Sequence, residues 1–176
     1  GLGTGERVAK HSLRIAAYGT VDETNSVVGV ARLHISGSFE AVGHMLVRIQ
    51  NDLFDLGADL CVPDNGKDPG YEPLRISAEQ VKRLEDEIDQ LNGELQALKS
   101  FVLPGGTPAA AHLHVARTVC RRAERLMVEL ASRDDEPVSE AALQYVNRLS
   151  DFLFVASRYV NDRGAADVLW VPGKNR

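Results

Sequence analysis

A basic segment in the second half of the sequence contains the side chains best suited to bind an anion. Residues 112–125 read HLHVARTVCRRAER. Four arginines lie within it: Arg117, Arg121, Arg122 and Arg125. On a helix, four side chains of this segment lie within about 80° of one another: His114, Arg117, Arg121 and Glu124. The guanidinium plane suits paired contacts with phosphate oxygens, so the segment is either a solvated face with internal ion pairs or a binding face for a polyanion.

Three weaker patterns accompany it. Asn147 and Asp151 lie one helical turn apart, and both are modest helix formers, so they mark a solvent-exposed face or a contact with a ligand or subunit. The opening GLGTGERVAK, which contains Lys10, is similar to a phosphate cradle, but it lacks a Walker-type lysine motif and also suits a flexible loop. The apolar loop FVLPGG, which begins at Phe101, either packs on the rest of the protein or holds a cofactor.

Apolar residues at steps of three and four predict the helices that position these segments. Thr20 and Glu23 have the spacing of a capping box, so we expect a loop over residues 1–19 and a helix over residues 20–37. A second helix is expected from residue 38 until Pro63, where the polar run PDNGKDPGYEP breaks the pattern. Ser77 and Gln80 repeat the capping-box spacing and predict a third helix, which ends near residues 92–93.

Two more helices follow. Thr107 as N-cap and Pro108 at the first helical position predict a fourth helix that ends before RDDEP at residues 133–137. A fifth helix is expected to start near Ser139 and to extend through Tyr159. The apolar stripes favour helices that cross at about 20°, so the predicted fold is an all-α, left-handed five-helix bundle with short loops.

Composition limits the class of protein. The 176 residues are 44% hydrophobic, and no linker rich in Pro, Gly or Ser divides the chain. This composition predicts one domain over residues 1–176. The net charge of −5 argues against nucleic-acid binding, and no apolar run is long enough for a bilayer. Cys61 and Cys120 lack a metal or disulfide spacing, so we expect a cytoplasmic protein. The Glu-x-x-His pairs of a di-iron bundle are also missing.

An ordered set of motifs extends this interpretation beyond a bundle with a cationic face. The motifs are AYGTVDETNS, LFDLGADL, FVLPGG, HVARTVCRRAERLMVEL and ALQYVNRLSDFLFVASRYVN. In this order and spacing they resemble the PduO-type ATP:cob(I)alamin adenosyltransferases over nearly the whole chain. The resemblance implies a five-helix bundle that assembles as a homotrimer and binds ATP and cobalamin at each subunit interface.

The resemblance also implies roles for particular residues. The catalytic residues are expected to be Arg121, Glu124 and Phe101, with Phe101 beneath the corrin, where it helps to exclude the lower axial ligand of cobalt. ATP is expected to contact Lys10, Arg121, Arg122, Glu124, Arg125 and Asn147, with residues 1–19 as the loop of the nucleotide site. Asp22 and Arg117 are similar to the family's inter-subunit salt bridge. No side chain is expected to bind a metal directly, but Mg²⁺ is expected to accompany ATP near Glu124.

The implied reaction transfers the 5′-deoxyadenosyl group of ATP to the cobalt of cob(I)alamin and releases triphosphate. It implies two protein partners, a cobalt reductase and an adenosylcobalamin-dependent enzyme. The family's T-R-T-G-D-x-G-T-T loop would lie upstream of GLGTGER, and we expect it to be trimmed or disordered rather than deleted. Two alternatives are a non-catalytic bundle that binds a corrinoid or tetrapyrrole as sensor or carrier, and a nucleic-acid-binding module that uses the arginine segment.

Overall fold

The described residues form an all-helical bundle. The structure is a computed structural model that describes residues 1–64, 66 and 70–176, so part of the polar run 63–73 lies outside the described residues. Its α-helices are α1 (Leu13–Arg32), α2 (Glu40–Cys61), α3 (Ala78–Asn92), α4 (Pro108–Ala131) and α5 (Glu140–Tyr159). Within these ranges there is no β-strand, and the predicted all-α fold is confirmed. None of the helices there has the length and apolar character needed to cross a bilayer.

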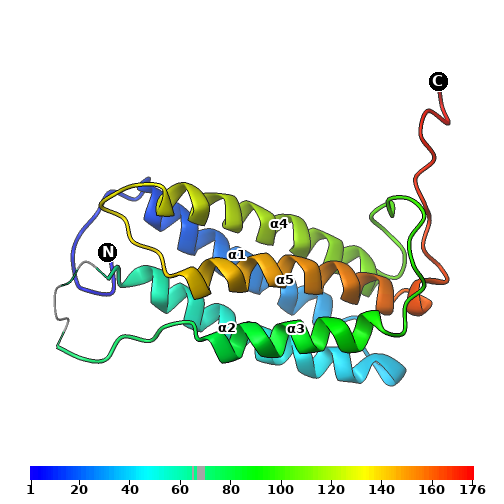
Figure 1. Cartoon of the computed structure of the whole chain (residues 1–176), viewed down its shortest axis with the longest axis horizontal. Helices are drawn as coiled ribbons and strands as arrows, with labels where there is room; N and C mark the ends of the chain where they lie inside the picture. Colours follow the sequence, from blue (N-terminus) through cyan, green and yellow to red (C-terminus); the bar gives the residue numbers. More distant parts are fainter. Residues whose placement is uncertain (65, 67–69) are drawn as a thin grey trace.

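Consecutive helices run in opposite directions along the long axis of the molecule (Figure 1). α1 packs against α2 and α4, and α5 packs against α3 and α4, so α4 lies beside both α1 and α5. One end of the bundle carries the N-terminal loop, and the other carries the loop before α4 together with the C-terminal tail (Figure 1). The helices thus separate the two ends of the molecule and expose one side of α4.

The apolar stripes read from the sequence form the core. In α4 the predicted stripe is fully buried at Leu113, Ala116, Cys120, Ala123, Met127 and Leu130. In α5 the predicted inward residues, which include Tyr145 and Phe152, are likewise buried. These stripes fix the rotation of each helix, because a one-residue change would move apolar side chains into water.

Three helix starts are the ones that the sequence predicts. The Ser77 hydroxyl accepts from the Gln80 amide and the Gln80 side chain accepts from the Ser77 amide, which makes a complete capping box. Thr107 caps α4 through the Ala110 amide, and Ser139 caps α5 through the Ala142 amide. The register of α4, on which the candidate site depends, is therefore set by a local signal.

The first helix begins earlier than the prediction at residue 20. Ser12 is its N-cap and accepts from the Ile15 amide, so the N-terminal loop covers residues 1–12 rather than 1–19. Thr20 lies inside the helix, where its hydroxyl donates to the Ala16 carbonyl at 2.8 Å. The helix also ends at Arg32, five residues before the predicted end, where the amides of Leu33, His34 and Ile35 donate to carbonyls three residues back. The short turn η1 (Gly37–Phe39) follows, and Gly37 in it has a left-handed φ of 62°.

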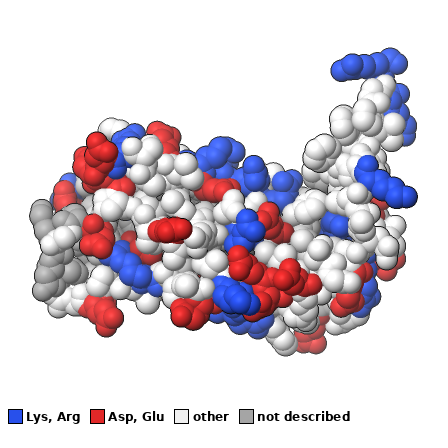
Figure 2. Space-filling view, viewed as in Figure 1, with Lys and Arg blue, Asp and Glu red and all other residues white. Residues whose placement is uncertain are grey.

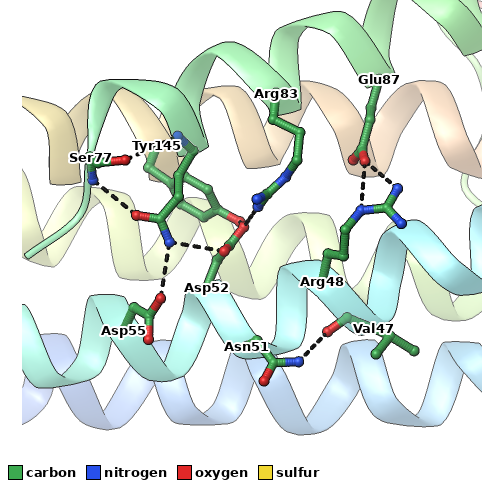
Figure 3. A network of polar contacts seen from close by, with 10 residues as sticks. Val47, Arg48, Asn51, Asp52, Asp55, Ser77, Arg83, Glu87 and Tyr145 are labelled. Carbon is green, nitrogen blue, oxygen red and sulfur yellow. Dashed lines mark hydrogen bonds and ion pairs between the residues drawn. The ribbon is translucent and has the colours of Figure 1, made fainter. Parts of the chain in front are cut away.

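A buried polar network connects α2, α3 and α5 (Figure 3). Asp52 accepts from the Tyr145 hydroxyl at 2.8 Å and from the Gln80 amide at 2.9 Å, and it forms an ion pair with Arg83. Asp52 and Tyr145 are both buried, and the burial and the Asp52 charge raise the pKa of Tyr145. We call these four residues the buried network. It gives the buried carboxylate of Asp52 and the buried hydroxyl of Tyr145 hydrogen-bond partners.

A strained turn follows α5. Asp162 and Arg163 in η2 (Asp162–Gly164) have φ angles of 55° and 48°, and Gly164 follows with a φ of 82°. A left-handed conformation costs a non-glycine residue about 1–2 kcal/mol, so neighbouring contacts must hold this turn. The turn sends the C-terminal tail, residues 165–176, back toward the loop that contains Phe101 (Figure 1).

Candidate functional site

The exposed side of α4 is the cationic part of the candidate site. Figure 2 shows Lys and Arg side chains along the upper edge of the molecule, where Figure 1 places α4. Arg121 and Arg125 are exposed, and neither forms a hydrogen bond or ion pair in the part of the chain that the structure describes. Two unpaired guanidinium groups on one helix side leave positive charge available for an anionic ligand.

Glu124 and Asn147 are brought together across the α4–α5 boundary. The Asn147 side-chain amide donates to Glu124 Oε1 at 2.6 Å, and Arg148 donates to Asn147 Oδ1 at 2.5 Å. Arg148 also pairs with Asp151 at 3.1 Å. The structure thus joins two of the predicted site residues, which lie on different helices, and it adds Arg148 and Asp151 to them.

The buried thiol of Cys120 lies near the charged groups of α4 and α5. Burial raises the pKa of its thiol most strongly, and the charges of Glu124 and Asp151 raise it further, while Arg121 lowers it. All three charged groups therefore act on one buried atom. We refer to Arg117, Arg121, Glu124, Asn147, Arg148 and Asp151 as the α4–α5 seam.

Arg117 is the seam residue nearest the start of α4, and His114 lies beside it on the same helix. Each has one buried nitrogen without a hydrogen-bond partner in the described part of the chain, Nε of Arg117 and Nδ1 of His114. Burial, and then the charge of Arg121, lower the pKa of Arg117. Burial, and then the charge of Arg117, lower the pKa of His114. A buried hydrogen-bond donor without an acceptor costs free energy, so we expect Arg117 Nε to donate to a group outside this chain.

An aromatic pocket of about 600 Å³ lies where the seam ends. Its lining includes Phe101, Arg117, Phe154 and Trp170. The Phe101 ring is 76% exposed, and its centroid lies 5.9 Å from that of Trp170 with a 54° angle between the rings. Exposed aromatic rings around a cavity are suited to a large apolar ligand. Because Arg117 lines this pocket and lies one helical turn from Arg121 on α4, the pocket adjoins the seam.

The other predicted site residues are placed differently. Arg122 forms an ion pair with Glu23 of α1, so it faces away from the Glu124–Asn147 contact. Lys10 is exposed in the N-terminal loop, at the end of the bundle opposite the loop that holds Phe101 (Figure 1). Asp22 is exposed and forms no ion pair with Arg117 within the chain. The structure brings neither Lys10 nor Asp22 to the other site residues of the same chain.

Sequence reasoning missed Trp170 and Phe154. Trp170 is the single tryptophan of the chain and lies in an apolar VLWV run beyond the last helix. That isolated apolar run with its tryptophan was a usable signal, whereas Phe154 lies outside the apolar stripe expected for the fifth helix and no pattern marked it. Among the described residues there is no group of three or more His, Cys, Asp or Glu arranged to bind a metal ion.

A helical bundle whose cationic seam opens into an aromatic pocket has the features of a protein that binds a phosphate-containing molecule next to a bulky apolar one. The chain matches the family model described as Cobalamin adenosyltransferase over residues 1–160. It therefore belongs to the cobalamin adenosyltransferase family, as its motifs indicated.

Named relatives and solved structures agree with this assignment. The corrinoid adenosyltransferase of Mycobacterium leprae is 49% identical over 98% of this chain and 90% of its own length. The cobalamin adenosyltransferase of Cupriavidus metallidurans is 49% identical over 97% of this chain and 87% of its own. A variant of the PduO-type ATP:corrinoid adenosyltransferase from Lactobacillus reuteri, complexed with cobalamin and ATP, is similar with a TM-score of 0.85 and 39% identity, covering 96% of this chain and 89% of that one.

Proposed function

We infer that this protein is an enzyme that transfers the 5′-deoxyadenosyl group of ATP to cob(I)alamin. The nucleophilic Co(I) attacks C5′ of the ribose, a cobalt–carbon bond forms, and the C5′–oxygen bond breaks. The electron pair of that bond leaves with triphosphate, and the cobalt in the product adenosylcobalamin is formally Co(III). Family membership and the cobalamin- and ATP-bound relative support this reaction.

The observation that carries the proposal is the position of Arg117 between the seam and the pocket. It connects a cationic surface that suits triphosphate with an aromatic cavity that suits a corrin. Direct displacement requires no side-chain base, so the protein contributes alignment and stabilisation of charge on the leaving group. The geometry suits this work because both substrates would lie against one continuous surface.

We assign the triphosphate to the arginines of α4. Arg121 and Arg125 are unpaired and free to donate to phosphate oxygens, whereas Arg122 must first exchange its partner Glu23. Asn147, held by Glu124 at 2.6 Å, presents its remaining amide hydrogen to the nucleotide. Lys10 reaches a nucleotide only from a neighbouring subunit or after a movement of the N-terminal loop.

Glu124 also suits an indirect contact with the Mg²⁺ that accompanies ATP. One of its carboxylate oxygens accepts from Asn147, which leaves the other oxygen to accept from a water bound to magnesium. Magnesium bound to ATP lowers the charge of the triphosphate, and Glu124 would orient the hydrated ion without binding it directly.

Phe101 is assigned to the lower face of the corrin. Its ring is exposed on the rim of the pocket, where an apolar surface would exclude water and the lower axial ligand from cobalt. Loss of that axial donor makes Co(II) easier to reduce to the nucleophilic Co(I). We therefore group Phe101 with Arg121 and Glu124 as the catalytic residues.

The unsatisfied Arg117 supports assembly into a homotrimer with Asp22 of a second subunit as its partner. Arg117 Nε is buried and unpaired, and Asp22 is exposed on α1. An ion pair between subunits would satisfy both and place the nucleotide at the interface. Reversing either charge should dissociate the assembly, and reversing both, in Asp22→Arg with Arg117→Asp, should restore it in light scattering.

We place the reaction in the cytoplasm, where a reductase would supply Co(I) and an adenosylcobalamin-dependent enzyme would use the product. Both cysteines are free thiols, which suits a reducing compartment.

The decisive experiment mixes the full-length protein with ATP, Mg²⁺ and chemically reduced cob(I)alamin. We expect loss of the Co(I) absorption and formation of photolabile adenosylcobalamin. If cobalamin binds but no product forms, the protein is a non-catalytic corrinoid carrier or sensor instead.

A further inference from the structure

A single buried carboxylate, that of Asp167, connects the two segments that carry the aromatic rings of the pocket. Asp167 Oδ2 accepts from Arg158 Nε at 2.8 Å, and Oδ1 accepts from the Asn161 side-chain amide at 3.0 Å. The side chains of Arg158 and Asp167 are only 7% and 5% exposed. This ion pair is therefore shielded from solvent, whereas pairs such as Arg122–Glu23 are about half exposed.

The partners of Asp167 extend the connection to both ends of the Phe101 loop. Arg158 also donates to the Gln96 carbonyl at 2.9 Å, and Asn161 Oδ1 accepts from the Thr107 amide at 3.2 Å. Gly106 permits the second contact, because a Cβ atom there would lie 2.3 Å from Asn161 Oδ1. The segment that contains Phe101 is thus anchored on both sides by groups that Asp167 orients.

On its other side, Asp167 leads directly into the tail residues that pair with this loop. The Leu103 amide donates to the Val168 carbonyl at 2.8 Å, and the Trp170 amide donates to the Phe101 carbonyl at 2.8 Å. The Ser100 hydroxyl donates to the Trp170 carbonyl at 2.7 Å. These contacts place the Phe101 and Trp170 rings next to each other at the pocket.

The strained turn before Asp167 shows that the tail is held in this position by its contacts. Asp162 and Arg163 are left-handed, and such residues persist only where the surroundings fix them. The tail beyond Asp167 is largely exposed, so it has little apolar burial of its own to keep it in place.

We propose that Asp167 is a positioning residue that holds Trp170 against Phe101 and so shapes the pocket for the flat face of the corrin. The proposal rests on the function proposed above only for the identity of the ligand. Asp167 touches no substrate, and it acts through Arg158 and Asn161. Trp170, which it positions, contributes the second aromatic wall of the pocket.

The test uses Asp167→Asn, which keeps an acceptor for Asn161 but removes the charge that pairs with Arg158. Because Trp170 is the single tryptophan, its fluorescence reports the position of the tail without any substrate. We expect emission shifted to longer wavelength as Trp170 leaves Phe101. We also expect KM for cob(I)alamin to rise about tenfold while KM for ATP stays unchanged, which corresponds to loss of one charge-assisted hydrogen bond.

Two variants make the result decisive. Asp162→Asn removes the same charge from an exposed neighbour that forms no ion pair in the described part of the chain, and it should leave both readouts unchanged. Ser100→Ala removes one exposed tail contact and should cause a weaker shift of emission in the same direction, even if Asp167→Asn fails to fold.

An unchanged Trp170 emission in Asp167→Asn would overturn the proposal, and so would equal increases in KM for both substrates. Inactivity of the unmodified protein would instead contradict the proposed function. The fluorescence shift would then still decide the structural role of Asp167.

Discussion

The buried network of α2, α3 and α5 and the α4–α5 seam use the same kinds of side chain, but they differ in how completely those side chains are paired. Asp52 accepts from three donors in the network. In the seam, Arg121 has no ion-pair partner among the described residues, and a buried nitrogen of Arg117 has none either. The charged groups of the network complete the fold, whereas Arg117 and Arg121 of the seam remain available to a ligand or a second subunit.

The ion pair of Glu87 with Arg48, beside the buried network, limits this distinction (Figure 3). Glu87 accepts from Arg48 through one carboxylate oxygen, but its other oxygen is buried without a partner in the described part of the chain. An isolated unpaired atom is therefore weak support for a binding site. The seam is distinguished by two arginines without an ion-pair partner among the described residues, Arg117 and Arg121, on a surface that adjoins a cavity.

The largest effect is expected from Asp52→Ala, which tests the network. The change leaves the buried Tyr145 hydroxyl without an acceptor and Arg83 without its partner, so we expect the free energy of unfolding to fall by about 3 kcal/mol. Urea unfolding measures this loss, and activity per folded molecule should not change. Asp86→Ala is the control, because water screens its exposed pair with Lys82 and the change should leave the unfolding midpoint nearly unchanged.

Arg121→Ala tests the seam, where we expect a loss of activity without a loss of stability. Removing one donor to the developing charge on triphosphate should lower kcat/KM for ATP about 100-fold, with a raised KM and a lower kcat. The unfolding midpoint should stay within error, since Arg121 has no partner to lose. Arg133→Ala, which removes an exposed arginine just beyond the C-terminal end of α4, should leave the kinetics unchanged. Unchanged kinetics in Arg121→Ala would remove this residue from the site.

Asn147→Ala should have a smaller effect, because it removes one neutral donor from the seam. We expect KM for ATP to rise about fivefold, the size expected when one hydrogen bond of about 1 kcal/mol is lost. Gln144→Ala is the matched control, since it removes an exposed amide on the same helix that donates to Glu140 at 2.8 Å. Equal KM values for the two variants would show that Asn147 belongs to the surface and not to the nucleotide site.

The sequence predicted the bundle well where the determining signals are local. Ser77, Thr107 and Ser139 were identified as helix starts because a cap involves only the next three residues. The same rule failed at the first helix, where Thr20 and Glu23 have the spacing of a cap but lie within a helix that starts at Ser12. Spacing alone does not show whether a threonine hydroxyl caps a helix or donates to the preceding turn.

The candidate site was less predictable because its contacts join distant parts of the chain. The arginines of α4 were visible as a cluster, Asn147 and the Phe101 loop were weaker patterns, and the resemblance added their expected roles. The role of Asp167 depends on contacts with Arg158 and, through it, with Gln96, and neither has a sequence signature. The aromatic wall formed by Trp170 likewise requires the tail to fold back over some 70 residues of chain.

The smallest effect is expected from a change at His114, which is buried beside Arg117. Burial and the charge of Arg117 lower its pKa in the folded protein, whereas the charge of Asp167 raises it more weakly. Below a pH of about 6.5 the unfolded chain binds a proton at this histidine more readily than the folded protein does. The contribution of His114 to stability is therefore present above that pH and is lost as the pH falls toward its lowered pKa.

We expect His114→Leu to flatten the decrease of the unfolding midpoint between pH 7.5 and 5.5, by no more than the effect of one proton, about 1.4 kcal/mol per pH unit. Thermal unfolding at several pH values measures the slope, and His11→Gln, an exposed loop histidine, should leave it unchanged. A slope in His114→Leu equal to that of the unmodified protein would mean that His114 binds a proton equally well in the folded and unfolded states, which would contradict the lowered pKa.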